Sequence, residues 1–258
     1  MHTTLSSQNN KATIDYSAQT IKMTKKQQTD RAQMKKAIQS KYDDYEFWKS
    51  ISSDAESALS TCQSLASDDA HLDRLLVARN YDSEAALSLF WEQVEFRTKY
   101  KPESISPADL PVSLPSGAWR CCGFGKDGQV VSNYKLQFWN PEKYDNDVEK
   151  AMEEYTLYVC YFVELMIRCG KKNDRFSLIF DLKGFHYGMV TQEKVRLMIK
   201  RLIYVAQAQY PERLGKVYLV NAPCKSLPVC ITTSLTLAFS ALSWILYGVE
   251  PHSGSARC

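Results

Sequence analysis

Two short stretches of this 258-residue chain carry residue types that could do chemistry. The glycines of residues 123–128 (GFGKDG) have the G-x-G-x-x-G spacing of loops that bind the pyrophosphate of a dinucleotide. Such a loop needs a helix directly after it, because the helix N-terminus holds the phosphate. Here a β-rich run, residues 129–139, follows, and no acidic residue stands in a suitable second strand. The sequence therefore favours a glycine-rich hairpin over a nucleotide site.

The second candidate is Asp181, at the end of the apolar run formed by residues 176–182. Strand ends host catalytic groups in open α/β sheets. However, no second carboxylate or histidine occupies a matching position, His186 stands alone, and no G-x-S-x-G elbow occurs. A structural aspartate that accepts hydrogen bonds from the amides of the next turn is the favoured interpretation. We predict no catalytic residue and no enzymatic activity.

Cysteine spacing and charge exclude further classes of site. The eight cysteines form no CxxC pair and have no histidine at ligand spacing, so we expect no metal and no cofactor. A net charge of +3, without a basic stripe interleaved with aromatic residues, argues against a nucleic-acid partner. The N-terminus lacks the apolar core of a signal peptide, so we expect a cytoplasmic protein with reduced thiols.

The elements around Asp181 read as strand, helix, strand. Residues 176–182 and 216–222 are short apolar β-type runs. Between them, apolar residues recur at helical spacing, with Thr191 as the predicted N-cap: Val195, Met198, Ile199, Leu202, Ile203 and Ala206. Two such strands joined by a helix predict adjacent or near-adjacent parallel strands with a right-handed crossover.

Upstream, the pattern predicts helices and then two more strands. Residues 69–100 contain two helices split at 80–82, with Asp82 or Ser83 as the second N-cap. The second of these helices should bury Ala86, Leu89, Phe90, Val94 and Phe96. After a Pro- and Ser-rich linker (101–116) come strand candidates 118–124 and 129–139. A long amphipathic helix follows, with one face from Val148 to Cys169 and Gly170 as C-cap. The chain is predicted to be an α/β protein.

The sequence DLKG at 181–184, followed by a helix and by YPERLGKVYLVNAP at 210–223, also resembles a known family. It is similar to the CRAL-TRIO lipid-binding domains, and most to the phosphatidylinositol/phosphatidylcholine transfer branch. The likeness covers about residues 69–223. It implies a mostly parallel sheet with flanking helices, preceded by a small N-terminal helical bundle. The expected organisation is a disordered tail (1–30), a helical bundle (31–100), a partial lipid-binding domain (117–223) and an atypical apolar tail (224–258).

The resemblance also implies a function and site residues. The function is non-enzymatic: binding, and in complete relatives transfer between membranes, of a phospholipid, here expected to be a phosphoinositide. Arg79 and Glu212 match an arginine and a glutamate of the family's inositide headgroup site. An ordinary Arg–Glu pair that docks the bundle onto the sheet is the alternative. The expected floor of the lipid pocket comprises Phe176, Leu178, Phe180, Val217 and Leu219. Phe176 and Leu178 replace the polar residues that contact choline lipids, so phosphatidylcholine recognition is not expected.

After Pro223 no family pattern continues. Residues 227–249 carry no charge and are long enough to cross a bilayer. They could be a membrane anchor, a divergent gate over the pocket, or the tail of a truncated or mis-spliced product. The abrupt change at Pro223 favours the last interpretation, which predicts slow lipid transfer. The expected partners are a phospholipid and, transiently, a membrane surface, and the protein is expected to be monomeric; the alternative is a membrane-tethered, non-catalytic scaffold.

Overall fold

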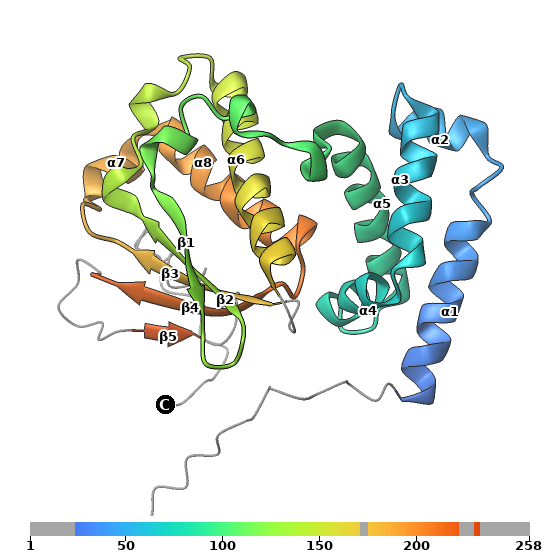
Figure 1. Ribbon diagram of the computed structural model, residues 1–258. Helices are drawn as coiled ribbons and strands as arrows, with labels where there is room; N and C mark the ends of the chain where they lie inside the picture. Colours follow the sequence, from blue (N-terminus) through green and yellow to red (C-terminus); the bar gives the residue numbers. More distant parts are fainter. Residues whose placement is uncertain (1–23, 171–174, 222–229, 233–258) are drawn as a thin grey trace, which may run out of the picture.

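The computed structural model describes residues 24–170, 175–221 and 230–232 of the chain. In this part, five α-helices form a bundle on one side, and a mixed sheet with its covering helices lies on the other (Figure 1). Residues 224–258, which include the predicted apolar segment 227–249, lie outside the described residues except for 230–232. No helix of the described part is long and apolar enough to cross a membrane.

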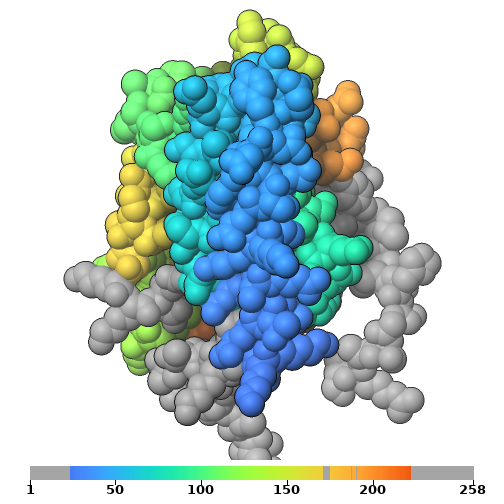
Figure 2. Space-filling view, turned by 90° about the vertical axis from the view of Figure 1, so that its right-hand side faces the viewer, coloured from blue at the N-terminus to red at the C-terminus, as the bar shows by residue number. Residues whose placement is uncertain are grey.

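The bundle has its own core. Its helices are α1 (Lys25–Gln39), α2 (Tyr45–Ile51), α3 (Ala55–Ser67), α4 (Asp69–Ala78) and α5 (Ser83–Tyr100). The first three form the outer face of the molecule on this side (Figure 2). Helix α1 begins before Arg31, inside the segment predicted to be disordered. A capping box between Thr24 and Gln27 satisfies its first amides and explains this early start.

The corner between α4 and α5 follows the prediction. Asn80 and Tyr81 have positive φ angles of 51° and 63°, which ends α4. Asp82 then caps α5 by accepting hydrogen bonds from the Glu84 and Ala85 amides at 3.1 and 3.0 Å. All five residues predicted to be buried in α5 are buried.

The linker contains the short 3₁₀ turns η1 (Pro102–Ser104), η2 (Pro107–Asp109) and η3 (Leu114–Ser116). The Glu154 carboxylate accepts hydrogen bonds from the Val112 and Ser113 amides, both at 2.9 Å, and so fixes the linker against helix α6 (Val148–Cys169).

Among the described residues, the sheet has five strands in chain order: β1 (Trp119–Phe124), β2 (Val130–Lys135), β3 (Phe176–Asp181), β4 (Leu214–Val220) and β5 (Cys230–Thr232). β2, β3 and β4 are parallel, and the edge strands β1 and β5 are antiparallel to their neighbours. The predicted parallel pairing of the strands on either side of the crossover is confirmed by β3 and β4. The α/β fold class is likewise confirmed.

Two helical crossovers connect the parallel strands. The turns η4 (Leu136–Phe138) and η5 (Pro141–Lys143) and helix α6 (Val148–Cys169) lead from β2 to β3. Helices α7 (Tyr187–Thr191) and α8 (Glu193–Tyr204) and the π-helical turn η6 (Val205–Gln209) lead from β3 to β4. Crossovers of one hand that step in the same direction place both helices on one face of the sheet. Accordingly, α6 and α8 both pack on the face that presents Phe176, Leu178 and Phe180.

Two local predictions need correction. Thr191 does not cap α8, because it closes the short helix α7, where its hydroxyl donates to the Gly188 carbonyl at 2.8 Å. The N-cap of α8 is Gln192. In α6, the predicted apolar face is buried in its middle, but Val148 and Cys169 at the two ends are exposed, since they extend beyond the part of the helix that packs against the core.

Candidate functional site

The sheet face under α6 and α8 holds an apolar cavity at the amino end of β3. Four of the five residues predicted to form a lipid pocket, Phe176, Leu178, Phe180 and Val217, line it. They share one face because side chains alternate along a strand and the register pairs Leu178 with Val217. The fifth, Leu219, is buried but is not among the residues that line this space. Val159, Val163 and Leu202 of the two helices form the opposite wall.

A second apolar cavity lies at the carboxyl end of β3. The residues that line it include Tyr134, Trp139, Tyr155, Leu182 and Ile199. Sequence reasoning did not identify this space, because its walls come from the loops after β2 and β3 as well as from α8.

Both cavities are small. Each has a volume of about 30 Å³. A ligand pocket that encloses a drug-sized molecule occupies roughly 300–1,000 Å³. An acyl chain therefore enters this space only if the sheet and its covering helices move apart.

Glu212 lies in the turn before β4 and forms an ion pair with Arg175. It has a positive φ of 59°, which is uncommon for a residue with a side chain. Arg175 Nη2 donates to the Glu212 carboxylate at 3.0 Å, and Arg175 Nε donates to the Glu212 main-chain carbonyl at 3.1 Å. Arg175 thus binds both the side chain and the main chain of Glu212. Sequence reasoning assigned no role to Arg175, although its position directly before β3 places it next to the turn that begins β4.

Arg79 lies at the C-terminal end of α4 in the bundle, where it is half-buried. Its guanidinium makes a long contact of 3.5 Å to the Ala78 carbonyl. The predicted pair thus comes from two separate units, the bundle and the turn before β4. The ion pair that the structure gives Glu212 is with Arg175 rather than with Arg79.

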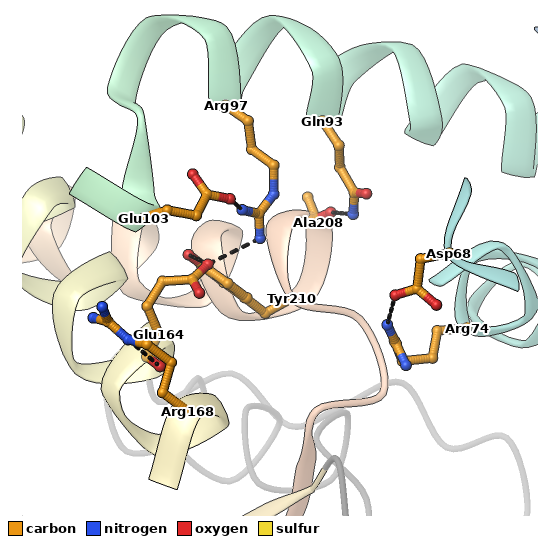
Figure 3. A network of polar contacts seen from close by, with 9 residues as sticks. All are labelled: Asp68, Arg74, Gln93, Arg97, Glu103, Glu164, Arg168, Ala208 and Tyr210. Atoms are coloured by element: carbon orange, nitrogen blue, oxygen red, sulfur yellow. Dashed lines mark hydrogen bonds and ion pairs between the residues drawn. The ribbon is translucent and has the colours of Figure 1, made fainter. Parts of the chain in front are cut away.

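A buried polar network joins the bundle to the sheet domain (Figure 3). Arg97 of α5 donates to the Glu164 carboxylate of α6 at 3.0 Å, and the Tyr210 hydroxyl donates to the same carboxylate at 2.8 Å. Arg97 also pairs with Glu103. One turn earlier on α5, Gln93 donates to the Ala208 carbonyl of η6 at 2.6 Å. Burial, followed by the nearby Cys160 and Glu164, raises the pKa of Tyr210, so its hydroxyl stays protonated and able to donate.

Sequence reasoning missed this network, although a signal was present. Gln93 and Arg97 continue the helical spacing of the buried residues Ala86, Leu89 and Phe90. A polar residue on the buried side of a helix implies a buried polar partner, because burial without one is costly. The sequence could not identify that partner.

The glycine-rich stretch and Asp181, which the sequence offered as candidate sites of chemistry, have structural roles. Residues 123 and 124 end β1, and residues 125–128 form the turn before β2, where the Gly125 amide donates to the Gln129 carbonyl at 2.8 Å, so the hairpin interpretation is confirmed. Asp181 accepts hydrogen bonds from the Lys183 amide at 3.0 Å and from Asn221 Nδ2 at 2.7 Å, as a structural aspartate does. Within the described ranges, no group of three or more His, Cys, Asp or Glu residues could hold a metal ion.

Comparison with known proteins identifies a domain family and relatives that this chain resembles. Residues 115–232 match the model of the CRAL/TRIO domain, and the match continues past Pro223, where the resemblance read from the sequence ends. A CRAL-TRIO domain-containing protein of Saccharomyces cerevisiae is 28% identical over 176 residues, which is 60% of this chain and 55% of that protein. The SEC14 cytosolic factor of Kluyveromyces lactis is 26% identical over 167 residues, with the same two coverages of 60% and 55%.

One further relative and one solved structure are also similar to this chain. A phosphatidylinositol/phosphatidylcholine transfer protein of Arabidopsis thaliana is 24% identical over 170 residues, covering 60% of this chain and 30% of that protein. The chain thus spans about half, or less, of the length of these relatives. The crystal structure of Sfh5 has a TM-score of 0.51 at 16% identity, covering 85% of this chain and 76% of that one, which supports the fold. Residues 115–232 of the chain are thus similar to the CRAL/TRIO domain family.

Proposed function

We propose that this chain binds one phospholipid, with its acyl chains between the sheet and helices α6 and α8. The observation that carries this proposal is the apolar space on one face of β3, lined by Phe176, Leu178, Phe180 and Val217, within a CRAL/TRIO domain. Each methylene moved there from water contributes about 0.8 kcal/mol. The names of two relatives, a phosphatidylinositol/phosphatidylcholine transfer protein and a cytosolic factor, support a lipid ligand and a cytoplasmic setting.

A phosphoinositide is the ligand that we propose in particular. Arg79 would bind the phosphate, because a guanidinium donates two parallel hydrogen bonds and keeps its charge. Glu212 would accept hydrogen bonds from inositol hydroxyls. Its pairing with Arg175 supports a second possibility, in which Glu212 only stabilises the turn before β4. The protein would act as a monomer, touch membranes transiently and catalyse no reaction.

The test is lipid uptake by the full chain from vesicles that carry labelled phosphatidylinositol, phosphatidylcholine or diacylglycerol. We expect phosphatidylinositol to be taken up best. Arg79→Ala should weaken its uptake about tenfold or more, since a hydrogen bond to a charged group is worth about 1.5–3 kcal/mol, and should leave diacylglycerol uptake nearly unchanged. Arg120→Ala is the control, because Arg120 is an exposed arginine of β1.

Absence of uptake for all three lipids would contradict the lipid proposal itself. Equal losses for phosphatidylinositol and diacylglycerol in Arg79→Ala would assign Arg79 a packing role. Glu212→Gln and Arg175→Gln separate the two readings of Glu212. If both lower stability to a similar extent without changing lipid preference, the carboxylate serves the turn and not the headgroup.

A further inference from the structure

The two apolar cavities meet at Phe180. The amino-end cavity contains Phe176 and Val217, and the carboxyl-end cavity contains Tyr134 and Leu182. Phe180 of β3 and Leu202 of α8 line both. Phe180 therefore projects from the sheet and Leu202 projects from α8. Both lie at the boundary between two spaces that follow each other along β3.

Phe180 is held firmly in this position. Its ring stacks on that of Tyr134, with the centroids 5.1 Å apart and the ring planes 3° from parallel. Tyr134 is itself buried, and its hydroxyl lies 3.4 Å from that of Tyr155 on α6. The register places Tyr134 and Phe180 directly opposite each other on adjacent parallel strands. Stacking and burial together restrict the side chain of Phe180 to one orientation.

We propose that Phe180 determines the length of hydrocarbon chain that the domain accepts, and that the carboxyl-end cavity is a second apolar subsite behind it. A chain that enters either cavity once the sheet and its covering helices have moved apart ends against the Phe180 ring. Removing that ring joins the two spaces into one longer channel lined by apolar and aromatic side chains. The inference rests on the proposed function for the nature of the ligand, a lipid, while the boundary itself follows from the lining residues.

The experiment compares Phe180→Ala with Phe176→Ala in the full chain. Both residues are buried phenylalanines of β3 on the same face, but Phe176 lines only the amino-end cavity. The probes are straight-chain alcohols from octanol to octadecanol, measured by displacement of an apolar fluorescent dye. An alcohol carries no phosphate, so its binding does not depend on headgroup recognition.

For the wild-type chain, affinity should rise with alcohol length and then level off. In Phe180→Ala the levelling should move to longer alcohols, with affinity increasing about fourfold for each additional methylene that enters the joined channel. Phe176→Ala should level off at the wild-type length. Phe180→Leu, a smaller change, should shift the limit less and provides a test if the alanine variant does not fold.

An equal shift in Phe176→Ala, no shift in either Phe180 variant, or no binding of any alcohol would overturn the inference. A shifted limit for alcohols in a chain that takes up no phospholipid would instead contradict the proposed function and leave the role of Phe180 intact. The two proposals therefore fail by different results.

Discussion

At the scale of a single residue, His71 shows how burial sets a charge state. It is 7% exposed in the bundle, and burial, with Arg74, Arg97 and Arg213 adding positive charge, lowers its pKa to about 3. Asp68 opposes this shift only in part. His71 is therefore neutral in the folded chain at pH 7, whereas in the unfolded chain it titrates near its ordinary value of about 6.5.

This difference predicts a loss of stability in mild acid. Between about pH 6.5 and pH 3, the unfolded chain binds a proton at His71 that the folded chain does not, so stability falls as the pH falls through this window. The contribution of His71 between pH 7 and pH 5 should be about 2 kcal/mol. Urea unfolding at the two pH values measures it. His71→Gln, which cannot titrate, should lose that much less stability between them, and an unchanged pH dependence would contradict the assignment.

At the scale of elements, α5 connects the bundle to the sheet domain through polar contacts as well as apolar ones. Gln93 donates a hydrogen bond to the Ala208 carbonyl of η6, and Arg97 donates one to the Glu164 carboxylate of α6. η6 is a π-helical turn, a geometry that is rare and often lies at functional sites. The contact from Gln93 satisfies a carbonyl in this irregular stretch. Because these groups are buried, removing one of them leaves its polar partner buried without a hydrogen bond.

Removing Arg97 should consequently cost far more than removing its exposed partner. Arg97→Met leaves the buried Glu164 carboxylate without its cation, and breaking a buried pair in this way costs about 3–5 kcal/mol. Glu103→Gln should cost less than about 1 kcal/mol, since this ion pair is exposed on the Glu103 side. Chemical denaturation of both variants compares them. Adding Glu164→Leu to Arg97→Met should restore much of the loss, and no recovery would mean that the charge on Glu164 is not the cause.

At the scale of the whole molecule, the space between the sheet and its covering helices is narrow in the described residues. Two cavities of about 30 Å³ cannot hold the acyl chains of a phospholipid. We predict that helix α8 moves to open the space, because Leu202 borders both cavities and the helix ends in the irregular turn η6. Helices α1 to α3, on the outer face of the bundle, touch neither cavity (Figure 2).

Lipid binding should therefore change amide hydrogen exchange in one part of the molecule. With phosphatidylinositol vesicles present, exchange in α8 and η6 should slow, since bound acyl chains would fill the space against which these elements open. Exchange in α1 to α3 should stay the same. A uniform change over both units, or one confined to the bundle, would contradict a pocket that opens at α8.

The sequence by itself determined most of the elements and the apolar face of the sheet under α6 and α8. The residues of β3 and β4 that face α6 and α8 follow from the two-residue period of a strand, and their parallel pairing follows from the crossover helix between them. The corner at Asp82 and the buried face of α5 follow equally from local rules of capping and helical spacing. The early start of α1 could be read from Thr24 and Gln27, because a capping box is a local motif as well.

Only the tertiary structure decided which distant residues meet. Arg175 binds Glu212, and Arg97 binds Glu164 across the boundary between bundle and sheet domain. Phe180 of β3 and Leu202 of α8 come together as lining residues of the same two cavities. Local periodicity fixes the face on which a side chain lies, but not the partner that packing brings to that face. Ion pairs, buried charge states and the lining of the cavities all depend on that partner, so they appear only once the helices are packed on the sheet.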